Sequence, residues 1–168
     1  MRNLFVSRLF SVLSVAVAML LSALVASEAM AKEGTFIVKF GAMLSRSVSP
    51  LGDRPGHELV QSVPEGTTQS SDPDWSDVPV VNYGQFDLVG GNGTVAGSTI
   101  RTHKNGDQSF YRFQGRLKAA TGGNLQDSTG EGTVELVGGT GKFANARGSG
   151  TWSSAGSGMS TIKMKVEY

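Results

Sequence analysis

Apolar and polar residues alternate along most of this chain in short runs that are separated by glycine-rich turns. Between residues 35 and 44, Phe36, Val38 and Phe40 alternate with Ile37 and Lys39, which is the period of a half-buried β-strand. No stretch after residue 31 has the period of about 3.6 residues that an amphipathic helix needs. The pattern predicts eight strands, at Thr35–Leu44, Glu58–Val63, Val80–Val89, Thr94–His103, Ser109–Ala119, Gly132–Val137, Lys142–Trp152 and Ser160–Tyr168.

The spacing of these strands indicates how they are connected. All 23 glycines lie after residue 33, and they are spread through the chain instead of being gathered in a linker. Short turns between consecutive strands predict an antiparallel meander, and closure of the meander into a barrel removes its two unpaired edges. We therefore predict an all-β fold, an eight-stranded antiparallel β-barrel formed as one domain by residues 32–168. A β-sandwich is the alternative.

One segment breaks this rhythm. Ser45–Pro79 contains Pro50, Pro55, Pro64 and Pro73, together with a polar run around Trp75. Because long segments of this composition are often lids or binding loops, we predict a long excursion over the surface or across one barrel mouth. Trp75 would then either cap that mouth or make a surface contact. The same segment also brings His57 within reach of a mouth.

The turn at Asn105-Gly106 allows the faces of its two strands to be predicted. If these two residues form a two-residue hairpin turn, Arg101 lies opposite Phe110 and Ile100 lies opposite Tyr111. Tyr111 then faces the interior, and its hydroxyl is a candidate donor to a ligand. Arg101 and His103 fall on the face that carries most of the polar residues, so we predict that both are exposed.

The sequence GGTGKFANARG, residues 138–148, gives a second set of facing predictions. With a four-residue loop at Gly138–Gly141, Leu136 faces Phe143, and the side chains of Asn145 and Arg147 then point inward. A buried guanidinium needs a partner. In one interpretation, Arg147 binds backbone carbonyls or an acidic side chain in the barrel wall. In the other, Asn145 and Arg147 line a lumen that binds an oxygen-bearing small molecule.

The first 31 residues have the features of a secretory signal peptide. Arg2 and Arg8 precede an uncharged, mostly apolar run, and Ala29-Met30-Ala31 matches the small-residue cleavage site. We predict cleavage after Ala31 and a secreted or periplasmic protein without a stable membrane anchor. The apolar run is also about long enough to span a membrane, so an uncleaved anchor is the alternative.

Charge and composition exclude several classes of function. The chain has 15 Lys and Arg residues against 14 Asp and Glu residues, and the two balance once Arg2, Arg8 and Glu28 are removed. This balance does not favour nucleic acid as a partner. The absence of cysteine excludes disulfides, thiol catalysis and cysteine-bound metals. The two histidines lack metal-ligand spacing, and the aspartates around Trp75 lack that of a calcium loop, so no metal site is predicted.

The string Gly138-Gly139-Thr140-Gly141-Lys142-Phe143, followed by Ala146-Arg147-Gly148, resembles the late hairpin of the allene oxide cyclase and dirigent barrels. The resemblance covers residues 34–168 in layout, but only about a dozen residues in motif. It implies an eight-stranded antiparallel barrel that holds a reactive molecule in one shape and needs no cofactor. It also implies that copies can associate through a barrel wall. The matching residues mark the barrel and not its chemistry, so no catalytic role is carried over.

Together these observations predict an exported barrel that binds a small, hydrophobic and oxygenated molecule in its lumen. The candidate ligand-binding residues are Tyr111, Asn145 and Arg147. The protein would guide cyclisation or coupling of that molecule as a cofactor-free cyclase or isomerase, or bind it without reaction. The alternative is a structural or interaction protein whose barrel interior is filled by side chains.

Overall fold

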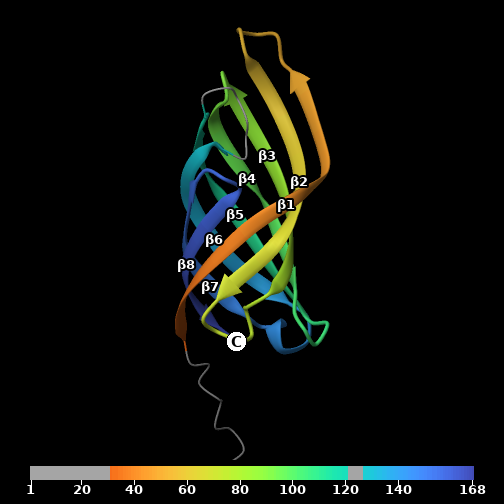
Figure 1. Ribbon diagram of the computed structural model, residues 1–168, viewed down its shortest axis with the longest axis vertical. Helices are drawn as coiled ribbons and strands as arrows, with labels where there is room; N and C mark the ends of the chain where they lie inside the picture. The colour runs from red at the N-terminus through yellow and green to blue at the C-terminus, as the bar shows by residue number, and fades with distance from the viewer. Residues whose placement is uncertain (1–30, 121–126) are drawn as a thin grey trace, which may run out of the picture.

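The computed structural model describes residues 31–120 and 127–168, which form a closed antiparallel barrel of eight strands in sequence order (Figure 1). The predicted fold class is therefore confirmed, whereas the predicted signal peptide lies, apart from Ala31, outside the described residues. No helix in the described part of the chain is long and apolar enough to cross a membrane. The strands are β1 (Lys32–Pro50), β2 (His57–Ser70), β3 (Val78–Val89), β4 (Asn92–Thr102), β5 (Gln108–Lys118), β6 (Thr129–Gly139), β7 (Arg147–Ala155) and β8 (Met159–Glu167).

The first hairpin is much longer than the sequence predicted. β1 extends to Pro50 and β2 runs from His57 to Ser70, so the expected excursion over residues 45–79 is wrong. Only the turns at 51–56 and 71–77 remain outside strands. Pro64 lies opposite Met43, between two irregularities in the β1–β2 register, where a proline costs few ladder hydrogen bonds.

The upper part of β1 has a partner on one side only. β1 pairs with β8 from Lys32 to Lys39, and beyond Phe40 it pairs with β2 alone. As a result the β1–β2 hairpin rises above the other strands at the top of Figure 1. At this upper end the barrel wall is therefore incomplete beside the turn between β7 and β8.

The hairpin between β4 and β5 has a different turn from the predicted one. The His103 amide donates to the Asp107 carbonyl (2.8 Å), and the Gly106 amide donates to the His103 carbonyl (2.9 Å). These bonds enclose a three-residue loop whose last residue, Gly106, has a φ of +86°. Arg101 therefore pairs with Ser109, and every side chain of β4 faces the opposite way from the prediction. Arg101 and His103 are buried, which corrects their predicted exposure.

The connection between β6 and β7 corrects the second set of facing predictions. The chain forms a short 3-10 helix, η2 (Gly141–Phe143), before β7 begins, and Leu136 pairs with Gly148 instead of Phe143. Phe143 is buried under the barrel end, but Asn145 and Arg147 are exposed. Their predicted inward orientation is wrong because the connection consumes more residues than a four-residue loop.

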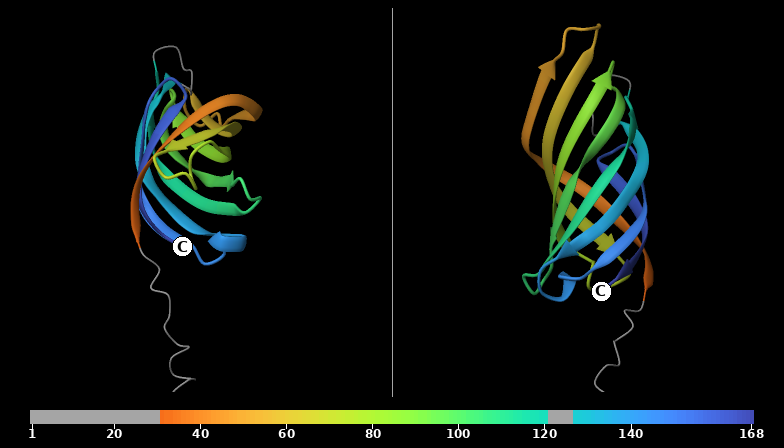
Figure 2. Two further views of the ribbon diagram at one scale, coloured as in Figure 1. Left: turned by 60° about the horizontal axis from the view of Figure 1, so that its bottom comes forward. Right: turned by 180° about the vertical axis from the view of Figure 1, so that it is seen from behind.

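The core is concentrated at one end of the barrel, which we call the closed end. The closed end is formed by the β2–β3 turn, the β4–β5 turn, the β6–β7 connection and the C-terminus. It lies at the bottom of Figures 1 and 2. Trp75 from the β2–β3 turn is fully buried there (0% exposed). The sequence left open a cap or a surface contact for Trp75, and the structure places it as the cap. Its ring contacts those of Phe36, His103, Tyr111, Phe143 and Tyr168.

Candidate functional site

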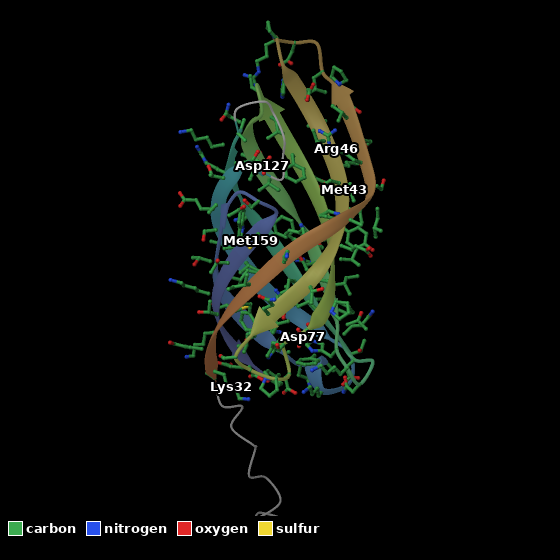
Figure 3. All side chains as sticks on the ribbon, in the orientation of Figure 1. Lys32, Met43, Arg46, Asp77, Asp127 and Met159 are labelled. Atoms are coloured by element: carbon green, nitrogen blue, oxygen red, sulfur yellow. The ribbon has the colours of Figure 1, made fainter. Side chains whose placement is uncertain are left out.

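The part of the lumen above this aromatic cluster contains a cavity of about 150 Å³. In Figure 3, Met43 and Met159 mark the middle of the molecule, whereas Lys32 and Asp77 mark the closed end. The cavity is lined by residues from every strand, and its walls are mostly apolar. The lining side chains used below are Val80, Asn82, Phe86, Thr99, Arg101, Phe113 and Trp152.

Aromatic rings and glycines give the cavity its walls. Trp152 lies so close to Gly115, Gly130 and Gly132 that a β-carbon at any of them would meet the indole within 3.2 Å. Phe113 covers Gly97 in the same way, since a β-carbon on that glycine would lie 2.6 Å from the ring. The glycines therefore allow large rings to approach the backbone of these strands closely, and a cavity remains beside the rings.

Arg101 occupies the boundary between the closed end and the cavity. It is 1% exposed, and its Cζ atom lies 4.3 Å from the ring centroid of Tyr111, 5.5 Å from that of Phe36 and 6.0 Å from that of Trp75. The negative faces of these rings attract the guanidinium. Aromatic faces do not, however, replace the in-plane oxygen acceptors that its N–H groups require.

The in-plane donors of Arg101 are only partly used. Nε and Nη1 are buried and have no hydrogen-bond partner among the residues that the structure describes. No carboxylate in that part of the chain forms a salt bridge with Arg101. The described residues that line the cavity include neither Asp nor Glu. Among the described residues, the cavity therefore has mostly apolar walls and a positive charge with no carboxylate partner.

A pair of polar side chains lies one step along β3 and β4 from Arg101. Asn82 and Thr99 pair with each other across the two strands, and Val80 and Arg101 form the next inward-facing pair. The Thr99 hydroxyl donates to Asn82 Oδ1 at 2.7 Å. This bond occupies an acceptor position of the amide and leaves its NH₂ group, which can only donate, for other contacts.

Tyr111 is inside the barrel, as predicted, but its hydroxyl is not part of the cavity wall. Its ring packs against Arg101, and its hydroxyl accepts a hydrogen bond from the Ser109 hydroxyl at 3.4 Å. The Ser109 oxygen also lies 2.9 Å from Nε2 of His103, whose Nδ1 lies 2.8 Å from the Asp74 carbonyl oxygen. Burial raises the pKa of Tyr111 and lowers that of His103, so both side chains are held neutral. Tyr111 thus packs its ring against the guanidinium of Arg101 and does not offer its hydroxyl to the cavity.

The other two predicted residues do not join this site. Arg147 Nη1 donates to the carbonyls of Val137 (3.1 Å) and Ala146 (2.7 Å) on the outside of the barrel. The expected binding of Arg147 to backbone carbonyls is therefore confirmed, but its inward orientation, which both interpretations assumed, is wrong. Asn145 is exposed in the β6–β7 connection.

Sequence reasoning missed Arg101 because the dipeptide Asn105-Gly106 fits two turns. In the structure, Asn105 Oδ1 accepts the Asp107 amide (3.1 Å), and its Nδ2 donates to the Asp107 carboxylate (2.7 Å). Asp107 two residues after Asn105 is the signal that favours this Asx-type arrangement over the two-residue turn. The residues of the turn thus indicated an Asx-type arrangement, but the prediction assigned the loop two residues instead of three.

His57 lies at the upper end of the barrel, where the sequence had placed it within reach of a mouth. Its Nδ1 is 2.6 Å from Asp53 Oδ1 in the β1–β2 turn, and its Nε2 is 2.8 Å from Asp87 Oδ1 on β3. These hydrogen bonds, to Asp87 first and then to Asp53, raise the pKa of His57. No group of three or more His, Cys, Asp or Glu side chains among the described residues is arranged to hold a metal ion.

Comparison of the sequence with known protein families and with curated proteins gives no match. The resemblance to allene oxide cyclase and dirigent barrels therefore depends on the quoted motif. The barrel itself and the lumen cavity follow from the structure.

Proposed function

We propose that this protein binds a small, largely hydrophobic and oxygen-bearing molecule in the lumen of its barrel. The observation that carries the proposal is the guanidinium of Arg101, a residue that lines an apolar cavity, whose buried Nε and Nη1 have no hydrogen-bond partner among the described residues. The proposed ligand would supply the missing oxygen acceptors and fill the apolar space above them.

The energetic argument starts from the cost of this arrangement. A buried ionic group without a full set of partners costs several kcal/mol, so such groups are usually paired or used. Contacts with Tyr111 and Phe36 offset only part of that cost, because they compensate charge and not hydrogen bonding. A ligand oxygen at Arg101 would compensate both.

The chemistry available in the cavity favours binding and orientation over acid–base catalysis. The described lining residues include no carboxylate and no histidine, so a general base is missing from that part of the wall. The resemblance to allene oxide cyclase and dirigent barrels supports a reaction in which the lumen holds a reactive molecule in one conformation. We propose that any cyclisation or coupling here proceeds in this way, without a cofactor, in an exported protein.

One observation favours the alternative of an interaction protein. The upper hairpin exposes apolar side chains, including Leu44 (56% exposed), Leu51 (46%) and Leu59 (43%). Exposed apolar residues that gather on one element often mark a contact surface. This surface lies on β1, β2 and their turn. A partner could bind this surface whether the lumen is empty or filled.

Native mass spectrometry of the protein purified from its native extract tests the proposed function. We expect a co-purified small molecule on the wild-type barrel and on the Arg147→Ala variant, which changes an exposed arginine. The Arg101→Met variant should lose it, because methionine supplies no donor. A wild-type protein that carries no ligand and behaves like Arg101→Met would contradict ligand binding in the lumen.

A further inference from the structure

We infer that the lumen ligand is a compact carboxylate: one ring, or an apolar group of similar size, joined to a carboxylate that binds Arg101. This inference depends on the proposed function, since it specifies the molecule that the lumen would bind. It is drawn from the donors at the base of the cavity, their net charge and the size of the space above them.

Arg101 and the amide of Asn82 supply hydrogen-bond donors at the base of the cavity. A guanidinium has one N–H on Nε and two on each Nη, so the buried Nε and Nη1 leave three N–H bonds without a partner among the described residues. The bond from Thr99 to Asn82 Oδ1 leaves the Asn82 amide with its NH₂ group as the free end. A ligand group with several acceptor lone pairs and no donor matches this set best. An ionised carboxylate has that character.

Charge distinguishes a carboxylate from a neutral carbonyl. A ketone or ester oxygen could accept one or two hydrogen bonds from Arg101, but it would leave the positive charge uncompensated in an apolar enclosure. The described residues that line the cavity contribute no negative side chain. A carboxylate supplies the counter-charge as well as the acceptors, and hydrogen bonds between two ionised groups are stronger than those between neutral groups.

The size and walls of the cavity limit the rest of the ligand. A volume of about 150 Å³ matches that of an engineered protein cavity that holds benzene. Phe86, Phe113 and Trp152 supply aromatic surface to the wall, and Val80 supplies aliphatic surface. A single six-membered ring would therefore contact apolar side chains on the cavity wall, with its carboxylate directed down toward Arg101.

Isothermal titration calorimetry with two matched probes tests this inference. The probes are 3-phenylpropanoate and 3-phenylpropanamide, which have nearly the same shape but differ in charge. We expect the wild-type protein to bind the acid about tenfold more tightly than the amide, or by a larger factor, since a bond to a charged partner is the stronger one. High salt should change this ratio little, because a buried pair is poorly screened.

Two arginine variants test which arginine is responsible for the preference for the acid over the amide. In Arg101→Met, we expect the preference for the acid to disappear while the amide still binds. In Arg112→Met, which removes an exposed arginine on β5, the preference should remain. A preference that survives in Arg101→Met would mean that the carboxylate binds elsewhere, and it would overturn the inference.

The wild-type measurements also separate the two proposals, whether or not a variant folds. Equal affinity for acid and amide would overturn the carboxylate inference and leave lumen binding intact. If both probes and the smaller pair, benzoate and benzamide, fail to bind, the proposed function itself fails.

Discussion

The two ends of this barrel are built from the same eight strands but are filled in different ways. At the closed end, Trp75 is fully buried and its ring contacts five other rings. In the upper part of the lumen, Trp152 and Phe113 lie close against glycines, and a cavity of about 150 Å³ remains. An eight-stranded barrel has just enough room to allow either outcome.

The difference shows how the molecule separates stability from binding. At one end, large buried rings pack around a residue from an element outside the strands, Trp75 of the β2–β3 turn. In the upper part, the glycines of the strands contribute no side chains to apolar contacts. A charged side chain, Arg101, lies at the base of this part. We therefore expect substitutions at the closed end to change stability, and substitutions around Arg101 to change binding.

The largest effect is expected from removing the central ring of the closed end. Trp75→Ala should lower the free energy of unfolding by about 3–5 kcal/mol, because it leaves a large cavity among rings that cannot collapse into it. Chemical denaturation monitored by circular dichroism measures this change. The matched variant is Trp152→Ala in the cavity wall, where the indole is only partly buried and the expected loss is smaller. Equal losses would remove the distinction between the two ends.

A smaller effect of opposite sign is expected at the boundary between the two ends. Arg101→Met should raise the free energy of unfolding of the ligand-free protein by about 1 kcal/mol, because it removes a buried charge that lacks a full set of partners. The gain is modest because the contacts with the Tyr111 and Phe36 rings are lost as well. Thermal and chemical unfolding of both proteins would show it. A clear loss of stability would mean that Arg101 is a structural residue.

The smallest effect concerns the pH dependence of the upper end. Hydrogen bonds to Asp87 and Asp53 raise the pKa of His57 above its ordinary value of 6.5. The protonated imidazole therefore stabilises the fold fully below about pH 6.5, and this stabilisation is lost as the pH rises through the higher folded-state pKa. His57→Gln should lower the unfolding midpoint more at about pH 6 than at about pH 9. Both partner carboxylates are solvent-exposed, so the difference should be small.

His103 at the closed end provides the contrast for that measurement. Burial lowers its pKa below 6.5, so the neutral form is the one that the fold favours, and stability is lost as the pH falls below the unfolded value. His103→Gln should therefore flatten the decline in stability on the acidic side, whatever packing it removes. If both histidine variants changed the pH profile in the same direction, the opposite assignments for the two ends would be wrong.

Much of the fold could be predicted from local pattern, and the failures have a common origin. The alternation around Phe36 and Val38, the short turns and the absence of helical periodicity predicted the eight-stranded barrel that the structure has, with a β-sandwich as the alternative. The prolines of residues 45–79 misled the prediction because a long, irregular hairpin can accept proline at a register shift. No sequence feature of that segment indicated that Trp75 lies at the centre of the core.

The candidate site depended on register, which local pattern records poorly. Tyr111 was placed inward correctly, since β5 has a single strongly apolar face, whereas β4 carries comparable residues on both faces. One additional loop residue before Asp107 turned Arg101 from the outer surface into the lumen. The longer β6–β7 connection moved Arg147 the other way.

The sequence by itself determined that the strands form, that they alternate and that consecutive strands pair, because side-chain period and turn residues act over a few positions along the chain. Only the tertiary structure decided which of several arginines is enclosed and which end of the barrel is filled. Those outcomes depend on loop lengths, where a change of one residue reverses every side chain of a strand, and on contacts between segments far apart in the chain.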